Sequence, residues 1–168
     1  MTKLLIAFLL CTFLACTDNI KPKVAVETVT EPIEGLWNLQ TMELKDDAGN
    51  WSEWRDGMKG YLLYDGKGHM ALHLIPSDYE KTTLEFPNFT DTISIDALRY
   101  ITNNYNYFGT YKIDYDSSIV SHYKISHSNP GEWFTTARRK FSFKGDTLIV
   151  RPVEEKNAKL RLKFLKED

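Results

Sequence analysis

Histidine is the residue type in this chain best suited to move a proton or bind a metal ion, so its spacing is the first test for chemistry. The chain contains His69, His73, His122 and His127. His69 and His73 share one face of an expected strand but stand ~13 Å apart at ~3.3 Å per residue. Zinc ligands must converge on bonds of ~2 Å. The spacing therefore predicts no metal site.

His122 is the candidate for acid–base chemistry. An imidazole can act as a general acid or base near neutral pH, and it can equally be a hydrogen-bonded structural side chain. No nucleophile motif, phosphate-binding loop or paired-carboxylate signature accompanies His122. The sequence therefore assigns no catalytic residue and no cofactor.

Aromatic side chains offer binding chemistry instead, and the chain has nine Tyr, nine Phe and four Trp residues. A tyrosine combines an apolar ring with one hydroxyl that can orient a ligand, although such side chains can also simply fill a protein interior. The candidate ligand-binding residues are expected to face inward from strands, and they are Tyr64, Met70, Leu72, Tyr107, Gly109, Tyr111, Tyr123 and Trp133. Gly109 leaves a notch that would hold either a ligand or a neighbouring backbone.

Arg139 is expected on an apolar strand face, which it shares with Trp133, Ala137, Phe141 and Phe143. A buried guanidinium must be stacked or hydrogen-bonded, because an unpaired buried charge is strongly destabilising. Arg139 therefore either packs structurally or binds a ligand carboxylate, and we favour the structural role.

Cys16 carries the one predicted covalent modification. Lys3 and the mostly apolar residues 4–14 form a run too short for a bilayer, which takes ~20 apolar residues, but typical of a secretory signal. The following Phe-Leu-Ala-Cys at 13–16 is typical of a lipobox. We expect residues 1–15 to be a signal peptide and Cys16 to be lipidated. The alternative is an ordinary cleaved signal with an incidental cysteine.

Lipidation would anchor the mature chain to a membrane of the bacterial cell envelope, and we expect the outer membrane. Residues 16–33 are polar, contain two prolines and form the expected lipidated tether. Cys11 lies in the expected signal peptide and Cys16 is the first residue of the tether, so the mature domain can form no internal disulfide, which suits an oxidising compartment.

Composition narrows the class of protein. A chain of 168 residues has room for one domain, and 42% hydrophobic residues suffice for a core. The net charge of −2 and the lack of a basic cluster beyond 138–140 argue against a nucleic-acid partner. We expect a monomer.

Residues 34–168 read as short strands separated by turn residues. The expected strands are 35–44, 59–65, 69–75, 105–115, 119–126, 133–143, 147–152 and a final one at 160–164. If Gly68 takes the left-handed position of a three-residue hairpin loop, Tyr64 lies opposite Met70, whereas a two-residue loop shifts that register by one. An even-numbered closed meander removes exposed edges. The fold class is therefore all-β, and eight antiparallel strands of this spacing form either an up-and-down barrel or a sandwich. We favour the eight-stranded antiparallel barrel, because an open sheet would leave exposed edges.

Residues 92–104 interrupt the strand pattern. Thr92 or Ser94 is suited to cap a short helix. Ile95, Leu98 and Ile101 would line one side of it, with Ala97 as a candidate fourth member. The barrel is therefore expected to carry one short helix.

Several stretches together resemble the bacterial and fungal lipocalin-like domain family. They are Gly35-Leu36-Trp37, residues 60–65, 68–70 and 107–114, Val120-Ser121-His122, Asn129-Pro130, and Arg139 ahead of Gly145-Asp146. The resemblance covers roughly residues 34–152 and implies a small lipocalin-like meander barrel without a settled activity. True lipocalins are similar in placing a late-strand arginine over the first-strand tryptophan, so the resemblance implies a structural stack of Arg139 on Trp37.

Three functions are compatible with this reading. The first is an envelope lipoprotein whose barrel binds a small apolar or amphipathic molecule. The second is a barrel enzyme of the cyclase or isomerase type that uses His122 or a pocket tyrosine. The third is a structural or partner-binding lipoprotein with a filled barrel. An internal cavity separates the first two from the third, and a titratable group with a perturbed pKa inside that cavity would favour the enzyme.

Overall fold

Antiparallel strands form the framework of the folded domain. The computed structural model describes residues 33–54, 57–86, 92–154 and 159–167. The strands are β1 (Gly35–Lys45), β2 (Trp51–Glu53), β3 (Met58–Tyr64), β4 (His69–Pro76), β5 (Tyr105–Asp114), β6 (Ile119–His127), β7 (Thr136–Lys144), β8 (Thr147–Pro152) and β9 (Leu160–Lys166). One α-helix, α1 (Ile95–Ile101), and two 3₁₀ turns, η1 (Tyr79–Lys81) and η2 (Pro130–Glu132), complete the described elements.

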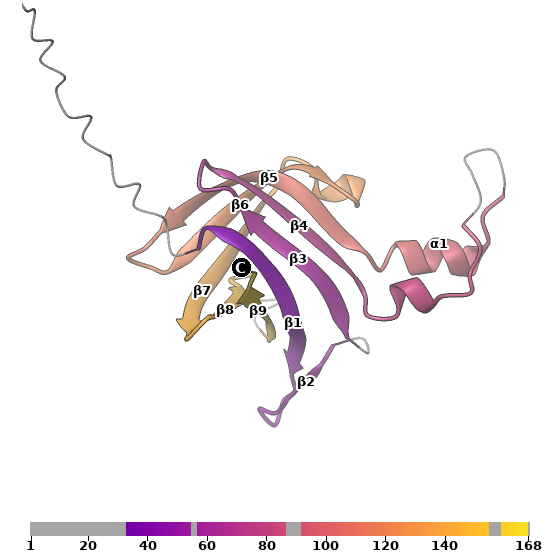
Figure 1. The fold of residues 1–168 in the computed structure, drawn as a ribbon, viewed down its shortest axis with the longest axis horizontal. Helices are drawn as coiled ribbons and strands as arrows, with labels where there is room; N and C mark the ends of the chain where they lie inside the picture. The colour runs from indigo at the N-terminus through magenta and orange to yellow at the C-terminus, as the bar shows by residue number, and fades with distance from the viewer. Residues whose placement is uncertain (1–32, 55–56, 87–91, 155–158, 168) are drawn as a thin grey trace, which may run out of the picture.

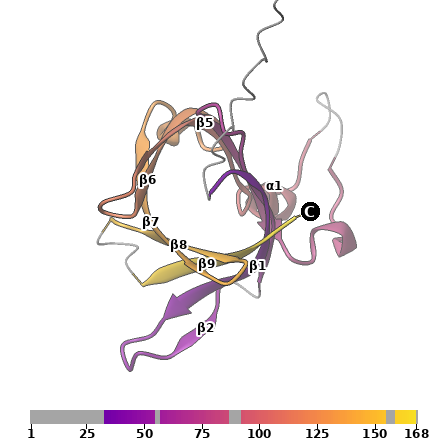
Figure 2. The ribbon, with the colours of Figure 1, turned by 60° about the vertical axis from the view of Figure 1, so that its left-hand side comes forward.

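The sheet closes on itself through its first strand. Each strand from β3 to β8 pairs with the next one in the chain, and β1 pairs with both β3 and β9, so the strands form a ring (Figures 1 and 2). Trp37 lies opposite Leu62 on one side and Lys166 on the other. A register shift between Leu39 and Thr41 lets β1 bend between its two neighbours. The predicted eight-stranded antiparallel barrel is confirmed.

β2 is a ninth strand that the sequence did not predict as one. It pairs with the far end of β1, where Glu43 lies opposite Glu53. With its three residues β2 forms a short hairpin with that end of β1, and this hairpin projects from the ring (Figure 2). A strand this short has too little alternation to be recognised from its own residues.

The β3–β4 hairpin has the register predicted from its glycines. Tyr64 pairs with Met70, and Gly66 and Gly68 both have positive φ, at 70° and 98°. The Asp65 carboxylate closes the loop by accepting hydrogen bonds from the backbone N–H groups of residues 67 and 69. The inward face of this hairpin is buried as expected.

β7 begins at Thr136, three residues later than expected. The 3₁₀ turn η2 precedes it, and Phe134 adopts a positive φ of 59°. This local reversal breaks the extended backbone, so Trp133 lies outside the strand. Ala137, Arg139 and Phe141 still share the inward side of β7, as alternation requires.

The helix α1 forms where it was expected, with Ser94 as its cap. The Ser94 hydroxyl accepts a hydrogen bond from the Ala97 backbone N–H at 3.1 Å. Ala97 is buried, whereas Ile95, Leu98 and Ile101 of the expected apolar side are all exposed. The helix lies in the connection from β4 to β5, beyond the ends of these strands and projecting from the barrel (Figure 1). Within the described residues no helix is long and apolar enough to cross a membrane.

One end of the barrel is filled by large side chains. The most completely buried of them are Trp37, Leu62, Tyr64, Met70, Leu148 and Phe164. Trp37 also donates its indole N–H to the Ile33 carbonyl at 2.8 Å. Ile33 is fully buried, so this residue, expected at the end of the tether, belongs to the domain. The predicted signal peptide, Cys16 and the rest of the tether lie outside the described residues.

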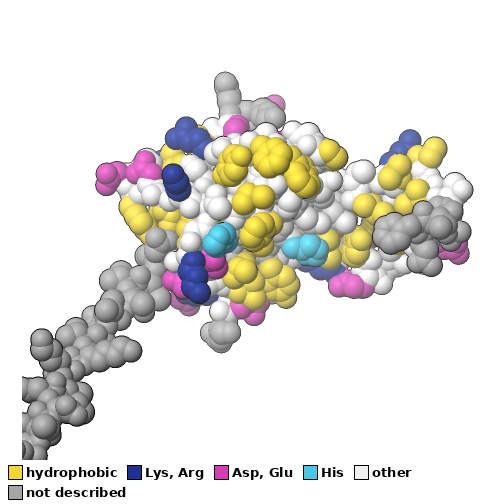
Figure 3. Space-filling view, turned by 90° about the horizontal axis from the view of Figure 1, so that it is seen from above, with side chains coloured by type: hydrophobic (Ala, Val, Ile, Leu, Met, Phe, Trp, Pro, Cys, Tyr) yellow, Lys and Arg dark blue, Asp and Glu magenta, His cyan; other side chains and the backbone are white. Residues whose placement is uncertain are grey.

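The outer face of the barrel carries exposed apolar side chains. Tyr61, Leu63, Phe108, Tyr123 and Ile125 extend outward from β3, β5 and β6. Figure 3 shows hydrophobic side chains gathered on one outer face of the molecule. Tyr123 is 44% exposed, so its predicted inward orientation is wrong, because Val120, His122 and Lys124 take the inward positions of β6.

Candidate ligand-binding cavity

The other end of the barrel contains a cavity of about 300 Å³. The lining residues are Met42, Trp54, Met58, Leu72, Leu74, Thr102, Asn103, Asn104, Tyr105, Arg139, Pro152, Leu160 and Leu162. Antiparallel strands alternate in direction, so the end of β1, the start of β3 and the end of β4 meet at one mouth. The volume is at the lower end of the range for small-molecule sites.

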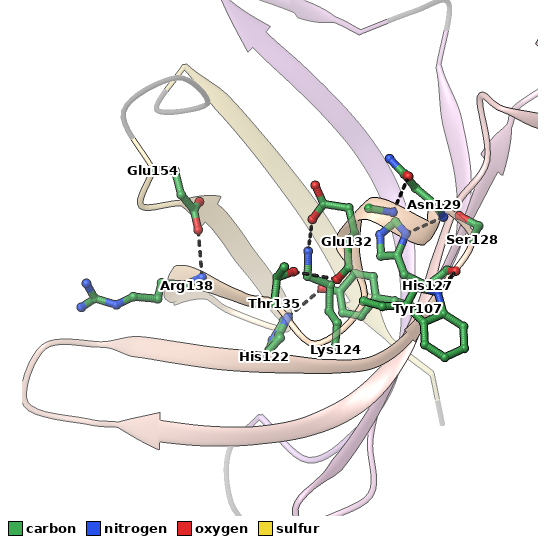
Figure 4. Close-up of polar contacts among 12 residues, drawn as sticks. Tyr107, His122, Lys124, His127, Ser128, Asn129, Glu132, Thr135, Arg138 and Glu154 are labelled. Atoms are coloured by element: carbon green, nitrogen blue, oxygen red, sulfur yellow. Dashed lines mark hydrogen bonds and ion pairs between the residues drawn. The ribbon is translucent and has the colours of Figure 1, made fainter.

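Among the described residues that line the cavity, Arg139 is the one that carries a charge. Its Nη1 donates to the Glu154 carboxylate at 2.9 Å and to the Arg138 carbonyl at 3.0 Å. Burial would raise the pKa of the Glu154 carboxyl, but hydrogen bonds from backbone N–H groups and the Arg139 charge lower the pKa below its usual value. One of these donors is the Arg138 backbone N–H, at 3.0 Å (Figure 4). Arg139 is therefore an ion-paired cation at the edge of an apolar cavity.

The expected stack of Arg139 on Trp37 does not form. The ammonium group of Lys166 lies 5.6 Å from the Trp37 ring centroid, and the Phe143 ring lies 6.0 Å away. Arg139 precedes Phe143 by four residues on β7, which is ~13 Å of extended chain. Trp37 thus packs in the filled end of the barrel, whereas Arg139 lies toward the mouth.

His122 joins two tyrosines deep in the barrel. Its Nε2 lies 2.7 Å from the Tyr64 hydroxyl, and its Nδ1 lies 2.7 Å from the Tyr107 hydroxyl. Burial lowers the pKa of His122 to about 3, and the nearby charges of Arg139 and Lys124 act in the same direction. The imidazole is therefore neutral at physiological pH. A neutral imidazole has one N–H donor and one acceptor, so one tyrosine donates to the ring and the other accepts from it.

This Tyr64–His122–Tyr107 chain is better suited to hold the barrel together than to catalyse. Burial raises the pKa of both tyrosines, so both hydroxyls stay protonated. An efficient general base has a pKa near the working pH, whereas that of His122 is several units lower. All three side chains lie outside the cavity lining. The geometry therefore favours the structural role for His122.

Lys124 is a second inward cation, which the sequence reading did not single out. Its side chain is 3% exposed, and its ammonium pairs with Glu132 of η2 (Figure 4). It also lies 5.8 Å from the centroid of the Tyr107 ring. The alternation of Val120, His122 and Lys124 was a signal that could have identified it.

His127 is packed among aromatic rings near the same mouth. Its ring is stacked on that of Tyr107, with centroids 5.6 Å apart and an interplanar angle of 8°. Its Nδ1 accepts the backbone N–H of Asn129 at 2.8 Å, whereas its buried Nε2 has no partner among the described residues. Trp133 donates its indole N–H to the His127 carbonyl at 2.8 Å. Trp133 is 44% exposed there, so its predicted place on the inward face of a strand is wrong.

The sequence candidates for ligand binding divide by their position along the barrel axis. Of these residues, Leu72 lines the cavity. Tyr64, Met70, Tyr107 and Tyr111 are buried in the interior below it. For these inward residues, direct contact with a ligand stays a prediction.

Gly109 does not provide room for a ligand. A Cβ built on this residue would overlap the carbonyl oxygen of Tyr123 on the neighbouring strand β6. The register of β5 against β6 shifts between Phe108 and Gly109, which brings the two backbones together. Of the two alternatives for the space at Gly109, a ligand or a neighbouring backbone, the neighbouring backbone is therefore correct.

A closed antiparallel meander with an internal cavity at one end is the architecture of a lipocalin-like, ligand-binding barrel. The sequence profile described as a lipocalin-like domain matches residues 34–164. The chain therefore belongs to the lipocalin-like domain family. A search for relatives among curated proteins finds no match.

Proposed function

We propose that this protein is an envelope lipoprotein whose barrel binds one small molecule with an apolar body. The observation that carries the proposal is the cavity of about 300 Å³, lined mostly by apolar side chains and by one cation, Arg139. Apolar walls with few polar groups are typical of small-molecule sites, in which the polar groups set the orientation. The cavity also argues against a completely filled barrel.

In this proposal the lipid on Cys16 holds the barrel at the bacterial outer membrane, and residues 17–32 act as a spacer. The ligand is then an apolar or amphipathic molecule of the envelope. The lipobox pattern at residues 13–16 supports this anchoring. The low pKa of His122 and its position outside the lining support binding rather than catalysis.

Uptake of the neutral fluorescent probe N-phenyl-1-naphthylamine tests the proposal. We would use the mature chain, residues 16–168, with Cys16→Ser to avoid detergent. Leu162→Trp adds a large ring to the cavity lining, whereas Leu165→Trp adds the same ring on the outer side of β9, where Leu165 is exposed. We expect Leu162→Trp to weaken probe binding at least tenfold and Leu165→Trp to leave it unchanged.

Two results would contradict this proposal. The first is wild-type protein that does not bind the probe. The second is equal probe affinity of the two tryptophan variants, when circular dichroism shows that both are folded. Native mass spectrometry of the purified protein would add whether a molecule of cellular origin remains bound.

A further inference from the structure

We infer that the molecule bound in the cavity is a monocarboxylate with an apolar body, and that Arg139 binds its carboxylate. This inference rests on the proposed binding function and names its ligand class. It depends on three observations: the unused donors of Arg139, the distribution of charge at the mouth, and the apolar remainder of the lining.

The first observation is that the Arg139 guanidinium uses only part of its donor capacity. A guanidinium has five N–H donors in a planar fork. Both described contacts of Arg139, to Glu154 and to the Arg138 carbonyl, are made by Nη1. Nε and Nη2 have no hydrogen-bond partner in the part of the chain that the structure describes. These two atoms form the edge of the fork that can bind both oxygens of a carboxylate at once.

The second observation is that two inward-facing cations, Arg139 and Lys124, are each more deeply buried than the carboxylate they pair with. The side chain of Arg139 is 13% exposed and that of Glu154 35% exposed. The second pair repeats this arrangement, with Lys124 at 3% and Glu132 at 39%. Among the described residues no carboxylate is buried, whereas Lys124 is. The described interior therefore contains buried cationic groups that an anion could approach, and no buried carboxylate that could pair with a cationic ligand.

The third observation is that the groups around Arg139 do not neutralise it from within. His122 is neutral, and the hydroxyls of Tyr64 and Tyr107 stay protonated. The rest of the lining is apolar or uncharged, including Leu72, Leu74 and Leu162. A single anionic group on an apolar body matches this combination, whereas a molecule with several charges would leave some of them against apolar walls.

Competition with N-phenyl-1-naphthylamine tests the ligand class. The competitors are decanoate and decanol, which share a ten-carbon chain and differ in charge at pH 8. We expect wild-type protein to bind decanoate at least tenfold more tightly than decanol. Arg139→Met should remove this preference. Arg138→Met is the matched control, because Arg138 is the exposed neighbour on the same strand, and it should keep the preference.

A second variant tests the same inference by a gain of affinity. Glu154→Gln removes the negative charge that offsets the charge of Arg139, so we expect decanoate to bind severalfold more tightly and decanol to bind unchanged. This variant decides the matter if Arg139→Met does not fold. Equal displacement by decanoate and decanol in wild-type protein, or unchanged decanoate binding in Glu154→Gln, would overturn the inference while probe binding itself stands. Failure of the probe and both competitors to bind would instead remove the proposed function and this inference together.

Discussion

Acidification should destabilise the barrel through protonation of His122 at pH values well above those at which the carboxyl groups of the protein titrate. Both ring nitrogens are hydrogen-bonded to tyrosines in the buried interior, and the folded pKa is about 3. The ordinary value, which applies to the unfolded chain, is 6.5. Between these two values the unfolded chain holds one more proton than the folded chain. Because the folded pKa is the lower one, stability is complete above pH 6.5 and falls as the pH falls toward 3.

The magnitude follows from the size of this pKa difference. Over that window the free energy of unfolding should fall by ~1.4 kcal/mol per pH unit. The loss should be ~2 kcal/mol between pH 6.5 and pH 5.0, and ~4 kcal/mol by pH 3. The informative interval ends near pH 5, because below it the carboxyl groups of the unfolded chain also begin to bind protons.

Urea unfolding at pH 7.5, 6.0 and 5.0, followed by tryptophan fluorescence, measures this loss. His122→Gln keeps a polar side chain that does not titrate, so it should lack ~2 kcal/mol of the pH-dependent loss. His73→Gln, at an exposed position on β4, is the matched control and should behave as wild type. His127, whose pKa burial also lowers, is present in all three proteins and does not affect the comparison. The same pH dependence in His122→Gln and wild-type protein would refute the reasoning.

Three further predictions concern Gly109, the pair Trp37 and Arg139, and Cys16. Gly109→Ala should destabilise the protein by roughly 3 kcal/mol, because the added methyl group meets backbone that cannot move aside. The control Gly131→Ala makes ordinary contacts and should change stability by less than ~0.5 kcal/mol. Equal effects of the two variants in urea unfolding would contradict this prediction. Trp37→Ala and Arg139→Ala should be additive within ~0.5 kcal/mol in a double-mutant cycle, and a larger coupling energy would show that the two residues interact. Cys16→Ala should abolish labelling of the cellular protein by a palmitate analogue, and persistent labelling would remove the lipoprotein prediction.

The meander barrel follows from local patterns that the sequence carries strand by strand. Two-residue alternation assigns most side chains to the inside or the outside, and short turns restrict consecutive strands to antiparallel pairs. The Gly66 and Gly68 positions even set the register of one hairpin, because left-handed backbone at those residues requires a particular loop. Each of these properties depends on residues close together in the chain.

Alternation along the sequence gave the wrong side-chain orientation where a bulge or a positive φ interrupts a strand. β6 has an extra residue where it passes Gly109, because Tyr107 pairs with His127 and Gly109 with Lys124. Strict alternation from Lys124 would turn His127 outward, but this bulge turns it inward, where it stacks on Tyr107. The positive φ of Phe134 similarly moved Trp133 out of its expected strand.

The position of each inward residue along the barrel axis was decided by the tertiary structure alone. Alternation placed Trp37 and Arg139 on inward faces, but the stagger that accumulates around a closed barrel put one in the filled end and the other at the cavity. The same stagger brought His122 between tyrosines of two other strands and brought Glu154 to Arg139. Such partners come from distant parts of the chain, and no local spacing encodes the stagger that joins them.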